Sequence, residues 1–576
     1  MTQKSVKSYE ENVSCWHWQF FTAPELPEME EFQKCFRGNF LTLQEGKTVQ
    51  GTEFSFPEDG KFDLKELLPP EARERERFVL AADFTAEEDS KLLLGFGFNW
   101  RWTLRFNGVL LLDARKCGNS ERPIMAENHI QELDIRKGSN LLLFEAVGGS
   151  YMAGEFRIMG KREPLALEYP PFITFPDAEE RAVTVSFSAN GESPAAVEYR
   201  KQGASEWKRV YDNLGGLARH DKKIHCIRLR DLSPGSMYEY RTVLVDDKRA
   251  WEEIFSETDV FCAPSDETEF SFLLTADLQN KQEREKFLES LLQTERSREA
   301  AFFVFCGDLF WTSDFDGEVM KAFIVPYRKY SENHLPLVMV RGNHEIYGME
   351  SSRFFDYFSA PEPGREGYTI FRRGQVCFLV LDFLDDNVRV PPPSTRRYLD
   401  VDPYLEAERA WLKRAVTLPV FQEAKFRIVL SHGIPVGDPG KVLPENVRKA
   451  IDPVFGGKDP AAKIHLWLGG HIHRPLRSIP NENAFYSMLS PAVFPPDRQF
   501  PPIGKNYSFP VLTVGGPSGG AGPEYTCTSI EVSVTDSSLT VRSFDLHHKE
   551  FDAFSISPEG RITEYGHVEC LKRYGY

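Results

Sequence analysis

Five short polar segments, each placed shortly after an apolar run, constrain what this chain can fold into. The apolar runs have the composition of buried strands: Phe270 to Thr275, Phe302 to Cys306, Leu337 to Val340, Ile428 to Leu430 and Ile464 to Leu468. The polar side chains that follow them, in the same order, are these: Asp277 and Gln279, Asp308, Asn343 and His344, His432, and His471 with His473. Because parallel strands bring their carboxyl ends to one edge of a sheet, we expect these groups to meet in one compact site.

The carboxylate, amide and imidazole groups in this set suit a pair of metal ions. Two ions about 3.5–4 Å apart lower the pKa of a bridging water and clamp a phosphate, and such closeness requires a shared anionic ligand. Asp308 is the natural bridge, and Asp277 would hold the first ion. Asn343 offers a neutral amide oxygen where a further carboxylate would add too much negative charge. Nitrogen donors would come from His432, His471 and His473.

Composition sets the broad class of the protein. A chain of 576 residues is too long to fold around a single hydrophobic core. At about 100–200 residues per domain, its length predicts three or four domains. No apolar stretch approaches the roughly 20 residues of a membrane helix, so no membrane span is expected. The formal charge of −17 argues against a nucleic-acid duplex as partner. An acidic protein can still take a phosphate ester if bound metal ions reverse the local field.

The cysteines and the first residues bear on the compartment and on the type of metal site. The chain has nine cysteines without CxxC pairs or regular spacing, which argues against a disulfide framework and a cysteine-ligated zinc. Met1 to Glu11 is polar and charged, with no apolar stretch of a signal peptide. We therefore expect a cytoplasmic protein, or a secreted one if a leader had been removed.

The first predicted domain, residues 1–165, is β-rich. Strand-like stretches include Lys91 to Phe96, Trp102 to Phe106 and Asn140 to Val147, and Asn107-Gly108 is a strong hairpin signal. The pattern resembles the jelly-roll β-sandwich modules appended to carbohydrate-active enzymes. Such a module either binds a carbohydrate or serves as a scaffold without a ligand, and both alternatives stay open.

Three further segments follow. A Pro-rich joint, Pro164 to Pro176, opens residues 166–265, where Leu232, Pro234 and Tyr238 have the spacing of a tyrosine corner. This segment resembles a fibronectin type III sandwich. In residues 266–556 strands alternate with helical stretches, which predicts α/β packing. Residues 557–576 form a predicted C-terminal tail with no assigned chemistry.

The ordered motifs resemble those of the calcineurin-like metallophosphoesterase superfamily: Asp277-Leu278-Gln279, Gly307-Asp308, Gly342-Asn343-His344-Glu345, Ser431-His432 and Gly470-His471-Ile472-His473. A fibronectin-like domain directly ahead of them is similar to the purple acid phosphatase arrangement. The resemblance implies a four-layer αββα catalytic domain and two divalent or trivalent metal ions, chosen from Mn, Fe, Zn and Ni. It also implies a phosphate ester as the substrate.

The same resemblance assigns the site residues one by one. The first metal would take Asp277, Asp308, His473 and Gln279, and the second Asp308, Asn343, His432 and His471. His344 would remain unligated, hydrogen-bond the phosphate beside Asn343, and protonate the leaving group. Glu345 and Arg474 are candidates to orient neighbouring ligands, and Phe310, Trp311 and Tyr347 are candidates to wall the cleft.

Two positions depart from the family pattern. Gln279 stands where many members carry histidine, and an amide is a weaker donor there. Trp311 stands where purple acid phosphatases carry a coordinating tyrosine. Since indole cannot coordinate as a phenolate does, we expect no tyrosinate–iron colour and no preference for Fe(III).

The expected reaction is in-line attack of a metal-bound hydroxide on phosphorus, with phosphomonoesters favoured by similarity to the acid phosphatases. A phosphodiesterase using the same site is one alternative, because the motifs serve both reactions. A glycan- or partner-binding protein with a non-catalytic phosphatase scaffold is another.

Overall fold

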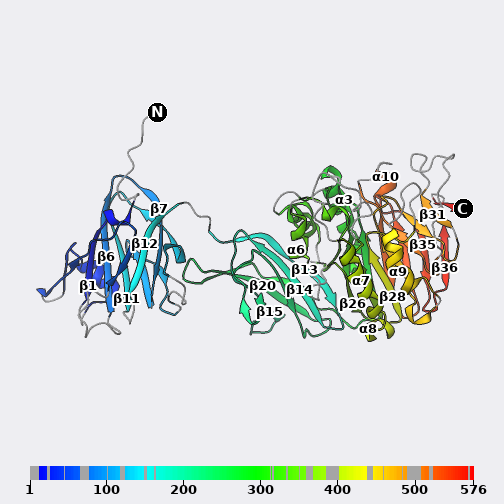
Figure 1. The fold of residues 1–576 in the computed structure, drawn as a ribbon, viewed down its shortest axis with the longest axis horizontal. Helices are drawn as coiled ribbons and strands as arrows, with labels where there is room; N and C mark the ends of the chain where they lie inside the picture. Colours follow the sequence, from blue (N-terminus) through cyan, green and yellow to red (C-terminus); the bar gives the residue numbers. More distant parts are fainter. Residues whose placement is uncertain are drawn as a thin grey trace, which may run out of the picture. The chain divides into compact units, whose positions relative to one another are not determined.

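Figure 1 shows the fold of the chain in a computed structural model. The structure describes residues 12–575 apart from residues 23–25, 44–45, 65–76, 100, 117, 119–123, 148–151, 161–163, 280, 312, 314–316, 332–334, 349, 359–366, 384–400, 437–444, 458, 483, 489–506, 518–522 and 568–570. The chain divides into two compact units: Met1–Ala166 with Gly191–Pro194 and Val243–Phe255, and Leu167–Asn190 with Ala195–Thr242 and Ser256–Tyr576. None of the helices in the described ranges is both long and apolar enough to cross a membrane.

The described part of the first unit contains two larger antiparallel sheets and a small pair of strands, β2 (Phe40–Thr42) and β3 (Thr48–Gln50). The larger has the order β4 (Thr52–Glu53), β1 (His17–Thr22), β6 (Arg77–Ala86), β11 (Gly138–Val147), β8 (Arg101–Phe106) and β9 (Val109–Asp113). The smaller has the order β10 (His129–Ile135), β7 (Ser90–Phe98), β12 (Ala153–Met159) and β5 (Lys61–Asp63). Both sheets contribute to one aromatic core that includes Trp102, Phe144 and Phe156. The predicted hairpin at Asn107-Gly108 joins β8 to β9, with both residues at positive φ.

The second unit is built on a ten-stranded and an eight-stranded sheet. The ten-stranded sheet has the order β19 (Ile224–Leu229), β14 (Ala182–Ala189), β13 (Leu167–Asp177), β25 (Leu337–Val340), β24 (Phe302–Cys306), β23 (Phe270–Thr275), β33 (Ser529–Val534), β34 (Leu539–Phe544), β35 (Glu550–Ile556) and β36 (Ile562–His567). Strands β23, β24 and β25 are parallel. Every residue of β24 is buried, as expected for a parallel strand covered on both faces.

The eight-stranded sheet has the order β26 (Thr369–Arg373), β27 (Val376–Leu381), β28 (Phe426–Ser431), β29 (Leu466–Gly469), β32 (Val511–Thr513), β30 (Leu476–Ser478), β31 (Ala484–Met488) and β37 (Leu571–Gly575). Its central strands β27, β28, β29 and β32 are parallel. The carboxyl ends of these strands therefore share one edge of the sheet, as do those of β23, β24 and β25 in the other sheet.

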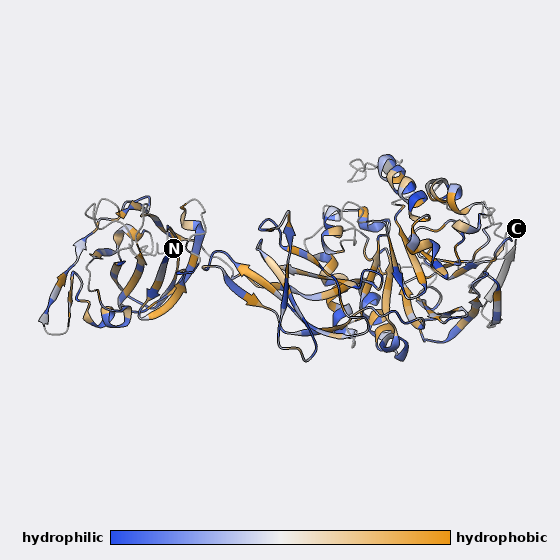
Figure 2. Ribbon diagram, turned by 90° about the horizontal axis from the view of Figure 1, so that it is seen from below, coloured by the Kyte–Doolittle hydropathy of each residue, from blue (hydrophilic) through white to orange (hydrophobic). Residues whose placement is uncertain are grey.

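Three apolar clusters hold the second unit together. One contains side chains from both sheets, such as Leu274 and Val304 with Phe378 and Ile428. The second lies between the ten-stranded sheet and the helices α3 (Lys281–Leu292) and α5 (Val325–Tyr330). The third lies between the eight-stranded sheet and the helices α7 (Val401–Ala415) and α9 (Glu445–Phe455). Figure 2 shows the central strands largely in the hydrophobic colour.

The segment expected to be a Pro-rich joint is instead mostly strand β13. Phe172, Ile173 and Thr174 pair with β14, and Thr174 also pairs in parallel with Leu337 of β25. Strands β13, β14 and β19 thus continue the ten-stranded sheet. Five other strands of residues 166–265 form a separate sheet: β16 (Lys208–Tyr211), β15 (Ala195–Lys201), β20 (Met237–Asp246), β21 (Glu252–Phe255) and β22 (Asp259–Cys262). Tyr238 accepts a hydrogen bond from the Ser233 amide at 2.9 Å, the interaction expected of a tyrosine corner.

The residues predicted to form a C-terminal tail contain two strands. Strand β36 pairs with β35 at the edge of the ten-stranded sheet, and β37 pairs with β31 at the edge of the eight-stranded one. The carbonyl of Pro558 also accepts a hydrogen bond from the ring of His465 at 2.8 Å. These residues therefore belong to the second unit rather than trailing from it.

Candidate metal centre

The predicted site residues lie shortly after the carboxyl ends of five parallel strands. Asp277 follows β23, Asp308 follows β24, Asn343 follows β25, His432 follows β28, and His471 and His473 follow β29. The first three strands belong to the ten-stranded sheet and the last two to the eight-stranded sheet. The two sheets therefore deliver ligands from opposite sides of one shared core.

Four of these residues hold a left-handed backbone conformation. The φ angles are 61° at Asp277, 62° at Asp308, 73° at His471 and 55° at His473. Such a conformation costs a non-glycine residue on the order of 1 kcal/mol and persists where surrounding contacts over-determine it. The Asp277 amide donates to the Gly307 carbonyl at 3.0 Å and the Leu278 amide to the Asp308 carbonyl at 2.7 Å. These bonds turn both carboxylates out of their strands and hold the two loops together.

Gly307 is required by the close packing of these loops. Its φ is 86°, and a Cβ at this position would lie 2.7 Å from Gly342 Cα and 2.7 Å from His432 Nδ1. Any larger residue would push apart the loops that carry Asp308, Asn343 and His432. The Gly-Asp pair of the sequence motif is thus a packing requirement beside a ligand.

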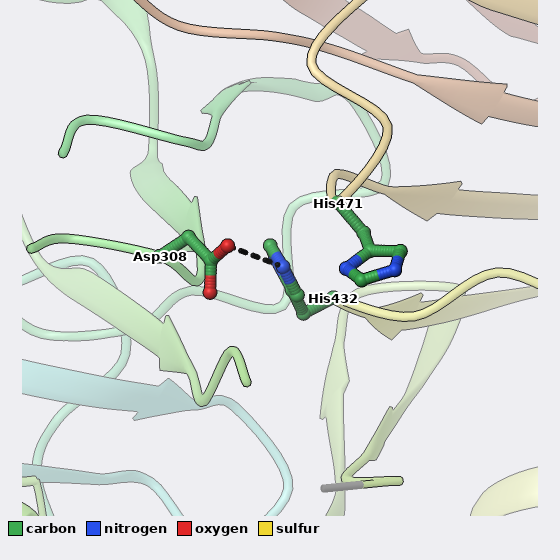
Figure 3. A group of neighbouring side chains, drawn as sticks. All are labelled: Asp308, His432 and His471. Carbon is green, nitrogen blue, oxygen red and sulfur yellow. Dashed lines mark ion pairs between the residues drawn. The ribbon is translucent and has the colours of Figure 1, made fainter. Parts of the chain in front are cut away.

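Two groups of potential metal ligands share Asp308. One consists of Asp308, His432 and His471, and the other of Asp277, Asp308 and His473; in each, the ligand atoms lie within 4.8 Å of one another. Figure 3 shows the first group, with the Asp308 carboxylate directed at the ring of His432 and His471 beyond it. A carboxylate common to two groups has the arrangement that a bridging ligand needs.

His432 presents one defined nitrogen to Asp308. Its Nδ1 donates to the Cys306 carbonyl at 2.6 Å, and its Nε2 lies 3.1 Å from Asp308 Oδ2. Burial alone would lower the pKa of His432, but the Asp308 carboxylate raises it to about 10. Desolvation likewise opposes ionisation of Asp308, and the charge of His432 overcomes it, so the pKa of Asp308 is lowered. His432 and Asp308 therefore lie as a buried, closely paired base and acid.

Asp277 is the anchor of the second group. Its Oδ1 lies 3.3 Å from His473 Nε2 and accepts a hydrogen bond from the His471 amide at 3.2 Å. Complete burial raises the pKa of Asp277, and the Asp308 carboxylate adds to this rise. Two carboxylates so close together and so deeply buried call for positive charge between them.

The two amide side chains have different surroundings. Asn343 Oδ1 lies 2.9 Å from His471 Nδ1, within the first group. Gln279 Nε2 donates to Asp308 Oδ2 at 2.8 Å. Its Oε1 is buried and meets no hydrogen-bond partner among the described residues. In this orientation Gln279 positions Asp308 through its NH₂ group, and its Oε1 is not engaged by another described residue.

The donor set fits two metal ions. Carboxylate oxygens and imidazole nitrogens converge in two groups that share Asp308, and the Asn343 amide oxygen lies against His471. A cation between these groups would offset the free-energy cost of burying the charge of Asp277. The same cation would coordinate the converging oxygen and nitrogen atoms.

Residues 270–475 match the family model described as calcineurin-like phosphoesterase. This part of the chain is a calcineurin-like phosphoesterase domain. By family it is a metal-dependent phosphoester hydrolase. No curated protein matches the chain.

Three solved structures are similar to this chain. A purple acid phosphatase from yellow lupin (Lupinus luteus) seeds is 13% identical, with a TM-score of 0.48, 85% of this chain and 94% of that one covered. A structure of PhoD is 11% identical, with a TM-score of 0.44, 70% of this chain and 92% of that one covered. A dimetal phosphatase from Danio rerio is 12% identical, with a TM-score of 0.33, 50% of this chain and 99% of that one covered.

His344 lies beside the candidate metal ligands in the phosphoesterase domain. Its amide donates to Asp308 Oδ1 at 3.0 Å, and its Nε2 lies 3.9 Å from Asp308 Oδ2. Its Nδ1 lies 2.9 Å from the Trp311 carbonyl, which fixes the proton on Nδ1 and leaves Nε2 facing the centre. The position suits a group that contacts a phosphate and transfers a proton, as the sequence predicted.

Glu345 holds three backbone amides around the centre. Its carboxylate accepts hydrogen bonds from Asp308 at 2.8 Å and from Leu309 and Gly342 at 2.6 Å each. Burial raises the pKa of Glu345, and the nearby Asp308 carboxylate raises it further. Glu345 therefore orders the loops after β24 and β25, which is the orienting role that the sequence suggested.

Sequence reasoning missed some of the supporting contacts. The carbonyls of Cys306 and Trp311 orient His432 and His344, and no side-chain motif signals a backbone acceptor. Arg341 forms a buried 2.6 Å ion pair with Asp382 at the end of β27. In the sequence, the position of Arg341 directly before Gly342 was the feature that could have indicated this supporting role. Of the three predicted wall residues, Phe310 lies in the apolar core and Trp311 is 53% exposed.

Proposed function

We propose that this protein is a binuclear metal-dependent phosphomonoesterase with a four-layer αββα catalytic domain. The observation that carries the proposal is the position of Asp308, which belongs to both groups of potential metal ligands. The preference for monoesters is supported by the resemblance of the motif order, with a fibronectin-like segment ahead of it, to the acid phosphatases.

The ligands divide into two sets in this proposal. Asp277, Asp308 and His473, with Gln279, hold one ion; the other is held by Asp308, Asn343, His432 and His471. When bound, the pair supplies a nucleophile at neutral pH and neutralises charge on the phosphoryl oxygens. Mixed oxygen and nitrogen donors suit Mn, Fe, Zn or Ni.

The chain's own groups perform the remaining tasks. Asn343 and His344 bind the phosphoryl oxygens and set the ester bond in line. In the imidazolium form both ring nitrogens of His344 carry a proton, and Nε2 gives its proton to the departing oxygen, a contribution typically worth about 10²–10⁴-fold in rate. The Trp311 carbonyl, 2.9 Å from Nδ1, keeps the ring in the orientation from which Nε2 can do so.

A phosphodiesterase acting through the same residues is the second candidate. The test is hydrolysis of p-nitrophenyl phosphate and bis-p-nitrophenyl phosphate side by side, after the protein is stripped and reloaded with Mn, Zn, Fe or Ni. Metal-dependent turnover that favours the monoester supports the proposal, and dominance of the diester replaces it. Two bound metals without turnover of either ester would favour a non-catalytic scaffold.

A further inference from the structure

Trp311 is the only member of the predicted aromatic wall that presents a large surface to solvent. Its side chain is 53% exposed, whereas Phe310 is 1% and Tyr347 is 9% exposed. The exposed indole belongs to a residue whose ring and carbonyl both contact His344, beside the candidate metal ligands.

The indole stands directly beside the proposed proton donor. The rings of Trp311 and His344 have centroids 4.9 Å apart and cross at 81°. The Trp311 carbonyl binds His344 Nδ1, so Nε2 of the same ring faces Asp308. An ester oxygen that takes a proton from Nε2 lies within hydrogen-bond distance of His344. A substituent on that oxygen would begin beside a ring that contacts the indole.

Backbone contacts anchor the chain close to Trp311. The Ser313 amide donates to the Tyr347 carbonyl and the Glu350 amide to the Ser313 carbonyl, both at 2.9 Å. Gly348 has a φ of 100°, and any Cβ there would overlap the Ser313 carbonyl. Ser313, two residues after Trp311, is thus tied to the chain that follows His344. An anchored backbone reduces the conformational entropy that is lost on binding.

We propose that Trp311 selects phosphate esters whose leaving group is a planar aromatic ring joined directly to the ester oxygen. The inference rests on the proposed function for the direction in which the leaving group departs. A planar ring can stack on or cross the indole, whereas a saturated ring of equal size makes only apolar contact. Aryl phosphates are therefore the substrate class that this site fits.

The test measures ligand binding rather than turnover. Benzylphosphonate and cyclohexylmethylphosphonate are non-hydrolysable and differ only in the planarity of the ring. Each is titrated by calorimetry into the metal-loaded full chain of the wild type, Trp311→Ala and Trp311→Phe. Both substitutions keep the backbone carbonyl that orients His344, and Trp311→Phe also keeps a planar ring.

Trp311→Ala should weaken benzylphosphonate by about 5- to 150-fold, the range found when aromatic stacking partners are replaced by alanine. The loss for cyclohexylmethylphosphonate should be at least about fivefold smaller, and Trp311→Phe should retain most of the preference. An equal loss for both ligands, no loss for either, or no binding by the wild type would overturn the inference.

The p-nitrophenyl phosphate assay on the same wild-type preparation separates the two proposals. Failure of hydrolysis with an intact preference for the planar ligand would reject the phosphatase proposal and leave an aromatic-anion site. Hydrolysis together with equal losses for both ligands in Trp311→Ala would leave the phosphatase and reject the role of Trp311.

Discussion

Glu345→Gln tests whether one buried carboxylate organises the metal centre. Glu345 Oε2 accepts the amides of Asp308 and Gly342, and Oε1 accepts that of Leu309. Hydrogen bonds to a charged group contribute about 1.5–3 kcal/mol each, and neutral ones about 0.5–1.5 kcal/mol. In glutamine two of the three bonds become neutral, and the new NH₂ group faces the third amide, which is left without an acceptor.

The magnitude follows from these contacts. Weakening two bonds costs about 2 kcal/mol, and a buried unsatisfied amide costs about 1–3 kcal/mol more. Removing the charge offsets part of this loss of stability, because burial and the Asp308 carboxylate disfavour the ionised form of Glu345 and raise its pKa. We expect a net loss of about 2–4 kcal/mol in the free energy of unfolding, and metal affinity about 10–100-fold weaker, as for other groups that support ligands.

Denaturant unfolding of the metal-free protein and calorimetric metal titration measure these two quantities. Glu198→Gln is the matched control, since Glu198 is a buried carboxylate of the same unit on β15, where it binds Arg209 and Arg241 rather than the centre. The control should lose stability but bind metal within about twofold of the wild type. Unchanged metal affinity and unchanged stability in Glu345→Gln would refute the reasoning.

Three further predictions concern other parts of the domain. His344→Ala should keep both metal ions but lower kcat by about 10²–10⁴-fold, measured with p-nitrophenyl phosphate beside metal analysis; unchanged kcat would remove His344 from the reaction. Gln279→His should bind the first metal more tightly in a calorimetric titration, since imidazole is the stronger donor; weaker binding would mean that the contact of Gln279 with Asp308 matters more. His465 should make stability pH-dependent, because burial lowers its pKa to about 4 and its Nδ1 accepts the Arg427 amide. The unfolded state then binds the extra proton below about pH 6.5, so up to about 3 kcal/mol is present above pH 6.5 and is lost as the pH falls toward 4. Denaturant unfolding of wild type and His465→Gln at pH 8 and 5 measures this difference, and parallel pH profiles would contradict it.

The candidate site was the part most open to prediction from the sequence. A buried apolar run followed closely by Asp277 or Asp308 predicts, from local sequence alone, where a strand ends and which side chain follows it. The order of such segments along the chain then places their side chains at one edge. What the sequence did not reveal was the left-handed backbone at Asp277, Asp308, His471 and His473, because it depends on bonds between loops distant in the chain.

The domain joints were less open to prediction, and the reason is pairing between distant segments. Leu167–Asp177 contains three prolines, which normally argue against a strand. Its pairing with β14 on one side and β25 on the other makes it a strand nevertheless. Strands β36 and β37 likewise form because the edges of two sheets are available to them. No local sequence pattern predicts which distant strand such a segment will pair with.

Metal stoichiometry in Asp308→Asn tests the central claim most directly. Elemental analysis after reloading, with p-nitrophenyl phosphate hydrolysis on the same samples, is compared for wild type, Asp308→Asn and the exposed control Asp536→Asn. The shared position of Asp308 predicts two metal ions per chain and metal-dependent turnover in the wild type and the control. Asp308→Asn should lose both the metal pair and the turnover. Two bound ions with full turnover in Asp308→Asn would contradict the account.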